Sequence, residues 1–322
     1  MAGSGITQIQ GVEPWMIDAF QNLSRDKGDR NLSGLLPTAG DTVDLEGTAA
    51  RCRCHFVASD GNNRVKIDAL ADKVARQALE YCTPRSRLLE AKAEFEMTGS
   101  YEGLVRLGNE ARELFTKAES SGEAGEMLLY LLLEVGLGLP QIFCKMPLKT
   151  NPQVHVHGVD GVHGSLEPDG RLGLYWCEAK LYGSASAATR ECFSSLAPYL
   201  LDDGSGPAER DLLLVRDGLD TGNEDLDRAL KRFLDDDQTA SQYRVVKGAC
   251  LIGFSLDDYP SPFAEDGVSL VQEVLGQIQA WFAGAGKRVV KEKIESFEIE
   301  IFCVPMPDVE QFRASVKEHL HL

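Results

Sequence analysis

Segments with the pattern of helices alternate with segments with the pattern of strands from residue 122 to residue 319. The strongest helix is predicted over 122–135, where apolar residues form one stripe, and Gly136, Gly138 and Pro140 end it. Strands are predicted over 141–147, 153–159, 171–180, 244–254 and 297–304. Further helices are predicted over 104–118, 186–200, 268–282 and 309–319. This alternation is typical of α/β proteins, so we expect a mixed sheet flanked by helices.

The chain of 322 residues is long enough for one large domain or two modest ones. Residues 1–45 are rich in Gly, Asp and Ser without periodicity, which predicts a loosely structured N-terminal segment. Residues 46–100 hold a predicted strand at 51–57 and a predicted helix at 67–79, which indicates an α/β lead-in. We expect the main domain to occupy residues 101–322.

The charge balance is strongly acidic, with 50 Asp and Glu against 33 Lys and Arg, a formal net charge of −17. A polyanion or an anionic membrane would repel such a chain, so we do not expect it to coat nucleic acid unaided. Nucleic-acid contact would need a local patch or a partner. The acidic segment from Asp202 to Asp237 is a candidate docking surface for such a partner.

The eight cysteines include no C-x-x-C pair, which excludes a zinc ribbon or a thioredoxin-type redox site. The N-terminus lacks the features of a signal peptide, and the longest apolar run, at 127–133, is too short to span a bilayer. We therefore expect a cytoplasmic protein that does not enter a membrane.

One window carries the residues most suited to chemistry. Asp160 lies in the sequence GVDGVHG (158–164), a turn is predicted at 167–170, and the following strand ends in Glu178-Ala179-Lys180. Strand residues two apart point to the same face, so Glu178 and Lys180 project together. If the two strands form a hairpin, Asp160 can lie beside Glu178. Such oxygen ligands suit Mg²⁺ or Mn²⁺ better than zinc.

This pattern resembles the PD-(D/E)xK nuclease superfamily, in which an acidic residue is followed, one hairpin later, by E-x-K. The resemblance implies a PD-(D/E)xK nuclease-like mixed sheet and metal-dependent phosphodiester hydrolysis. It assigns metal binding to Asp160, Glu178 and the Ala179 carbonyl, and assigns activation of water and stabilisation of negative charge to Lys180. The superfamily often adds a helical glutamate before the hairpin. Glu126 fits that position best and Glu123 is the alternative.

A closer resemblance covers roughly residues 50–305. The segments RCRCHFVASDG (51–61), GEAGEMLLYLLL (122–133), GVDGVHG (158–164) and YWCEAK (175–180) look like HamA, the nuclease family of the bacterial Hachiman antiphage systems. That resemblance implies an Mg²⁺- or Mn²⁺-dependent deoxyribonuclease. It also implies a partner, the superfamily 2 helicase HamB, and DNA degradation when infection is sensed.

Two alternative functions remain open. His155 and His157 with Asp160 approach the H-x-H-x-D-H motif of zinc metallo-hydrolases, but Asp160 is one position late and no histidine follows it directly. The chain could also be a catalytically inactive regulatory subunit of a helicase complex. A third motif, GAGKR (284–288), lacks the Ser or Thr and the leading glycine of a phosphate-binding loop, and it indicates a turn.

Overall fold

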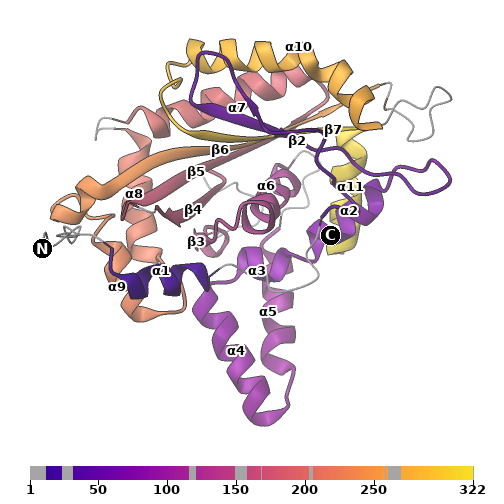
Figure 1. Cartoon of the computed structure of the whole chain (residues 1–322). Helices are drawn as coiled ribbons and strands as arrows, with labels where there is room; N and C mark the ends of the chain where they lie inside the picture. Colours follow the sequence, from indigo (N-terminus) through magenta and orange to yellow (C-terminus); the bar gives the residue numbers. More distant parts are fainter. Residues whose placement is uncertain are drawn as a thin grey trace, which may run out of the picture.

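A single seven-stranded sheet forms the centre of the molecule in the computed structural model (Figure 1). The structure describes residues 12–23, 32–115, 121–148, 158–167, 169–202, 206–257, 259 and 270–321. The strands are β1 (Val43–Asp44), β2 (Ala50–Cys54), β3 (Gln141–Phe143), β4 (Gly161–Leu166), β5 (Leu172–Tyr182), β6 (Arg244–Ser255) and β7 (Ile299–Met306). Their order across the sheet is β1-β2-β7-β6-β5-β4-β3.

The sheet is mixed, as the sequence predicts. Strands β5, β6, β7 and β2 are parallel neighbours, whereas β3 and β4 at one edge and β1 at the other run antiparallel to their neighbours. β2 comes from residues 46–100 and pairs with β7 near the C-terminus. The predicted lead-in therefore contributes a strand to the same sheet as the strands of residues 101–322.

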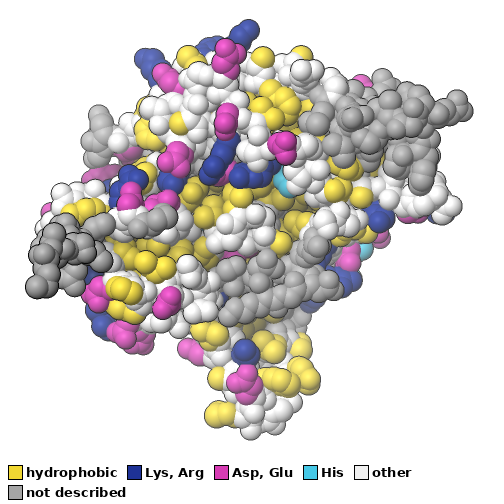
Figure 2. Space-filling model, in the orientation of Figure 1, with side chains coloured by type: hydrophobic (Ala, Val, Ile, Leu, Met, Phe, Trp, Pro, Cys, Tyr) yellow, Lys and Arg dark blue, Asp and Glu magenta, His cyan; other side chains and the backbone are white. Residues whose placement is uncertain are grey.

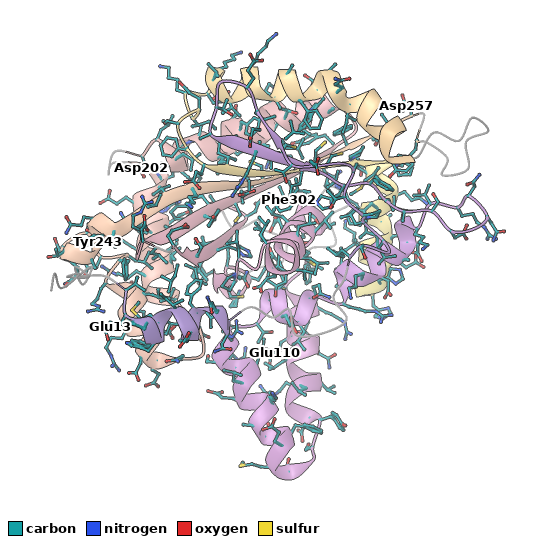
Figure 3. The ribbon with its side chains drawn as sticks, viewed as in Figure 1. Glu13, Glu110, Asp202, Tyr243, Asp257 and Phe302 are labelled. Atoms are coloured by element: carbon teal, nitrogen blue, oxygen red, sulfur yellow. The ribbon has the colours of Figure 1, made fainter. Side chains whose placement is uncertain are left out.

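Helices cover both faces of the sheet (Figure 1). One face is covered by α7 (Ala185–Leu200) and α10 (Leu270–Lys291). The other face is covered by α2 (Ile67–Ala75), α6 (Glu123–Leu131) and α11 (Val309–Leu320). Each layer encloses its own apolar core, and Phe302, labelled in Figure 3, is 1% exposed in the core under α6 and α11.

The remaining helices lie around the sheet. They are α1 (Pro14–Gln21), α3 (Ala78–Cys82), α4 (Arg85–Thr98), α5 (Glu102–Glu113), α8 (Pro207–Gly218) and α9 (Glu224–Lys231). Within residues 1–45, α1 buries Met16 and Phe20 against the body. Helices α4 and α5 pack together as a hairpin that projects away from the sheet (Figure 1).

Most predicted elements are confirmed within a few residues. The helix predicted over 122–135 is α6, continued by one π-helical turn at Leu132–Gly136. Residues 153–157 of the strand predicted over 153–159 lie outside the described residues.

The turn predicted at 284–288 is wrong, because these residues lie inside α10. Ala285 and Val289 are fully buried there, and this apolar contact outweighs the helix-weakening effect of two glycines, about 1 kcal/mol each. Across the described ranges, no helix combines the length and the apolar character needed to cross a membrane.

Candidate active site

The β4–β5 hairpin places Asp160 beside the longer of its two strands. β4 begins at Gly161, opposite Cys177, so β5 extends beyond it. The Asp160 N–H donates to the Cys177 carbonyl at 2.9 Å, and the Ala179 N–H donates to Asp160 Oδ2 at 2.8 Å. The Asp160 carboxylate therefore lies at the edge of β5 next to Ala179. A strand residue turns its N–H and C=O to the same side, so the Ala179 carbonyl faces this edge as well.

The tight turn of this hairpin has the geometry that its sequence predicts. The Glu167 N–H donates to the Arg171 carbonyl at 2.8 Å, and Gly170 has φ of +81°, a conformation that glycine adopts without strain. This turn fixes the register of the hairpin, and that register sets which β5 residues lie next to Asp160.

Glu178 and Lys180 project from the same face of β5 and form an ion pair, in which Lys180 Nζ donates to Glu178 Oε1. β5 is flanked by β4 and β6, and Glu178 is 4% exposed, so this is not a solvated pair on an edge strand. Burial and the nearby Asp160 carboxylate raise the pKa of Glu178 to about 7. Burial lowers the pKa of Lys180, but the carboxylates of Glu178 and Asp160 outweigh it and raise that pKa.

Helix α6 brings Glu126 to the opposite face of the same strand. Gly125 permits the close approach, because a Cβ there would lie 3.1 Å from Leu181 Cγ and 3.5 Å from Ala179 Cβ. Glu126 is half-buried, and its Oε2 accepts a hydrogen bond of 2.9 Å from the Tyr81 hydroxyl. Desolvation and the Asp160 carboxylate raise the pKa of Glu126 to about 8.

Glu123 lies one turn earlier on α6 and is buried. Its Oε2 accepts a hydrogen bond of 3.2 Å from the Ser121 hydroxyl, and its charge contributes to raising the pKa of Glu126. The structure thus brings Asp160, Glu178, Lys180 and Glu126 together around Ala179, with Glu123 one helical turn from Glu126.

Two residues of this region carry no recognisable signal in the sequence. Lys145 follows β3, and its Nζ donates to the Val159 carbonyl at 2.6 Å, next to Asp160. Its positive charge counteracts the rise in pKa of both Glu126 and Glu178. Tyr81 comes from α3, far from the hairpin in sequence. Each reaches the site through tertiary contacts alone, and no motif spacing could have indicated them.

The donor set fits a hard divalent cation better than zinc, because its side-chain oxygens come from carboxylates. The described residues contain no cluster of three or more His, Cys, Asp or Glu arranged to hold a metal by itself. Mg²⁺ does not require such a cluster, since it is usually bound by one or two carboxylates, several waters and the phosphate oxygens of the substrate.

The zinc alternative of the sequence stays a prediction that the structure does not test. His155 and His157 lie outside the described residues. His163 is 2% exposed, and its Nδ1 lies 2.8 Å from the Leu139 carbonyl oxygen, so its ring faces the interior.

Comparison with protein families shows to which family the chain belongs. The profile of the HamA family matches residues 38–320, nearly the whole chain. The chain belongs to the HamA family. It is thereby a bacterial Hachiman antiphage defence protein, part of a defence system with other subunits. No curated protein sequence matches it significantly.

The match to HamA spans every residue placed at the candidate site. It begins upstream of β1 and ends at the last residue of α11, so it includes all seven strands of the sheet. Helix α1 precedes the matched range.

Proposed function

We propose that this HamA-family chain is a metal-dependent nuclease that hydrolyses phosphodiester bonds of DNA during antiphage defence. The observation that carries the proposal is the convergence of three carboxylates and one ammonium group around the Ala179 edge of β5. Asp160, Glu126 and Lys180 are each only partly buried among the described residues.

Asp160, Glu178, Glu126 and the Ala179 carbonyl are the groups that would hold Mg²⁺ or Mn²⁺. Such an ion lowers the pKa of a bound water and neutralises charge on the phosphate when it is bound. The raised pKa values of Glu178 and Glu126 support this assignment, because they reflect burial of both carboxylates and, next to it, the negative charge of Asp160 close by.

Lys180 is the group we assign to the attacking water and the developing negative charge. Its ammonium group remains protonated because Glu178 and Asp160 raise its pKa, so it acts as a fixed positive charge and a hydrogen-bond donor. A preorganised donor of this kind stabilises a phosphoryl transition state without having to reorganise during the reaction.

We further propose that a helicase subunit delivers DNA to the site. The net charge of −17 opposes a polyanionic substrate. On the described part of the face in Figure 2, Lys and Arg are interspersed with Asp and Glu and do not form a broad basic surface. A partner that threads DNA toward the nuclease would supply the missing attraction and would also restrict cleavage.

The acidic segment 202–237 is predicted from the sequence to be a docking surface, but some of its carboxylates form hydrogen bonds that stabilise the local fold. Asp202 accepts hydrogen bonds from the N–H groups of Gly206 and Glu209 at the start of α8. Asp227 accepts from Thr221 before α9. Docking would therefore use the exposed members, such as Asp217 and Asp225.

The test is cleavage of linear and supercoiled DNA with Mg²⁺, with Mn²⁺ and with EDTA, by the chain alone and together with the helicase encoded beside it, with and without ATP. Glu178→Gln should abolish cleavage. Glu167→Gln, at the far end of the same hairpin, is the matched control and should cleave normally.

Three outcomes would contradict the proposal. Cleavage by Glu178→Gln at the wild-type rate would remove the nuclease assignment. Activity that depends on zinc and on His157 would favour the metallo-hydrolase. The absence of cleavage under every condition, including the helicase complex with ATP, would favour the alternative that the chain is a catalytically inactive regulatory subunit.

A further inference from the structure

Tyr81 reaches the candidate site from a part of the chain that precedes its main elements. It lies on α3, between the strand β2 and the helix α6, and is 3% exposed. Its hydroxyl donates to Glu126 Oε2 at 2.9 Å.

The ring and the backbone of Tyr81 are fixed as well. The ring packs against that of Tyr130, with 5.4 Å between ring centroids. Tyr130 is four residues after Glu126 and therefore on the same side of α6. The Tyr81 carbonyl accepts a hydrogen bond of 3.3 Å from the Cys144 thiol, in the segment that also carries Lys145. Tyr81 is thus held at its hydroxyl, at its ring and at its backbone carbonyl.

This contact distinguishes the two oxygens of Glu126. Oε2 is engaged by Tyr81, whereas Oε1 lies beside Gly122, where a Cβ would be 3.4 Å away. A carboxylate with one oxygen fixed by a buried donor cannot rotate freely. The remaining oxygen then has a defined position at the start of α6.

We propose that Tyr81 is the positioning residue of the metal site, which fixes Glu126 through Oε2 so that Oε1 is available to ligate the cation. The inference rests on the proposed function and adds to it a residue outside the E-x-K motif. It also makes the predicted lead-in a contributor to the active site. Hydrogen-bond partners of metal ligands commonly alter metal affinity 10- to 100-fold when they are removed.

The test is Mn²⁺ binding to the full chain by isothermal titration calorimetry, without DNA. Tyr81→Phe removes the hydroxyl and keeps the ring, and we expect about tenfold weaker binding. Tyr259→Phe is the matched control, because the Tyr259 hydroxyl bonds only to backbone groups of Val57 in the described structure. Its Mn²⁺ affinity should remain that of the wild type.

A double-mutant cycle separates positioning from a general loss of structure. Glu126→Gln should weaken Mn²⁺ binding, and adding Tyr81→Phe to that variant should weaken it no further, because the two residues act through one contact. Additive losses would overturn the proposal. So would unchanged Mn²⁺ binding by Tyr81→Phe.

Hydrogen exchange provides a measurement that does not need a tyrosine variant to fold. In the wild-type chain, Mn²⁺ should slow amide exchange across α3, and in Glu126→Gln this protection should disappear. Equal protection in both proteins, or none in either, would overturn the role of Tyr81. A wild-type chain that binds no Mn²⁺ would remove both the inference and the proposed metal dependence. If the wild-type chain cleaves DNA in a metal-dependent way and Tyr81→Phe binds Mn²⁺ as well as the wild type does, only the inference about Tyr81 is overturned.

Discussion

The carboxylate of Asp160 accepts a hydrogen bond from the backbone N–H of Ala179, so it occupies the place of a neighbouring strand beyond the start of β4. This contact joins the two halves of the motif without using the side chains of Glu178 or Lys180. Among the described residues, the hydrogen bond to the hairpin uses Oδ2 of Asp160, so Oδ1 can serve a ligand while Oδ2 serves the hairpin.

We expect Asp160→Asn to lower DNA cleavage at least about 100-fold, the effect typical of removing a fixed charge at such a site. The asparagine oxygen can still accept from the Ala179 N–H, so the hairpin should persist. Stability should stay equal or rise, because repulsion with Glu126 and Glu178 is relieved. Cleavage rates and thermal denaturation measure the two effects. Asp169→Asn, exposed on the same hairpin turn, is the control, and a similar loss there would contradict the assignment.

Lys180→Met should slow cleavage ~10²–10³-fold, because a preorganised positive charge is lost from the transition state. Mn²⁺ affinity should not weaken, since an ammonium group repels the cation. Single-turnover cleavage and calorimetry measure the two quantities separately. If Lys180→Met binds Mn²⁺ as poorly as Asp160→Asn does, the division of roles between these residues is incorrect.

Gly125→Ala should reduce both stability and cleavage. Its Cβ would lie 3.1 Å from Leu181 Cγ, so the Leu181 side chain or α6 must shift by a few tenths of an ångström, and a shift of α6 carries Glu126 with it. Overpacking of this kind costs about 1–3 kcal/mol in the free energy of unfolding, measured by chemical denaturation. Gly108→Ala on α5 is the control, because a Cβ there meets no atom within 4 Å, and it should be neutral or stabilising. Equal behaviour of the two variants would refute the close-approach argument.

The metal-free chain should lose stability as pH rises from 5.5 to 8.5. The folded-state pKa values of Glu178, about 7, and Glu126, about 8, exceed the ordinary value of 4.5, so the folded state holds these protons more tightly. Their contribution is complete below about pH 4.5 and is lost as pH rises through the folded pKa values, by up to about 1.4 kcal/mol per pH unit and group. Thermal denaturation in EDTA measures the slope. Glu178→Gln combined with Glu126→Gln should flatten it, and an unchanged slope would show that other groups cause it.

Replacing His155 and His157 together by alanine should leave Mg²⁺- or Mn²⁺-dependent cleavage in place, because oxygen ligands suffice for these ions. The measurement is a metal titration of cleavage activity with the double variant and the wild type. A double variant that is inactive with Mg²⁺ and Mn²⁺ would show that the histidines have a catalytic role.

The sequence predicts the part of the site that is local in the chain. Asp160, Glu178 and Lys180 belong to one hairpin, and the turn and strand patterns determine their arrangement. Glu126 could be anticipated because the superfamily resemblance places a glutamate near the start of a helix before the hairpin, and Glu126 lies in the first turn of α6. Tyr81 and Lys145 could not, because their positions depend on tertiary packing of α3 and of the segment after β3.

Two helical segments show the same limit in the fold. Helix α4 has no apolar stripe and buries only Ala91, so periodicity gave no indication of it. The glycines at 284 and 286 resemble a turn, yet α10 continues through them because its apolar residues pack on the sheet layer. In both cases a neighbouring element stabilises a helix that the local sequence does not specify.

The pairing of β2 with β7 has a consequence for synthesis of the chain on the ribosome. Arg51 and Glu300 form an ion pair across these two strands, 249 residues apart in sequence. A nascent polypeptide that has passed residue 255 already contains the entire E-x-K hairpin together with β2 and β6, but the strand that lies between β2 and β6 has not yet been made. Contacts of such long range form late and slowly. The sheet that supports the hairpin is therefore completed only after residue 306 has been made, and a prematurely terminated chain would expose two unpaired strand edges to quality-control proteases.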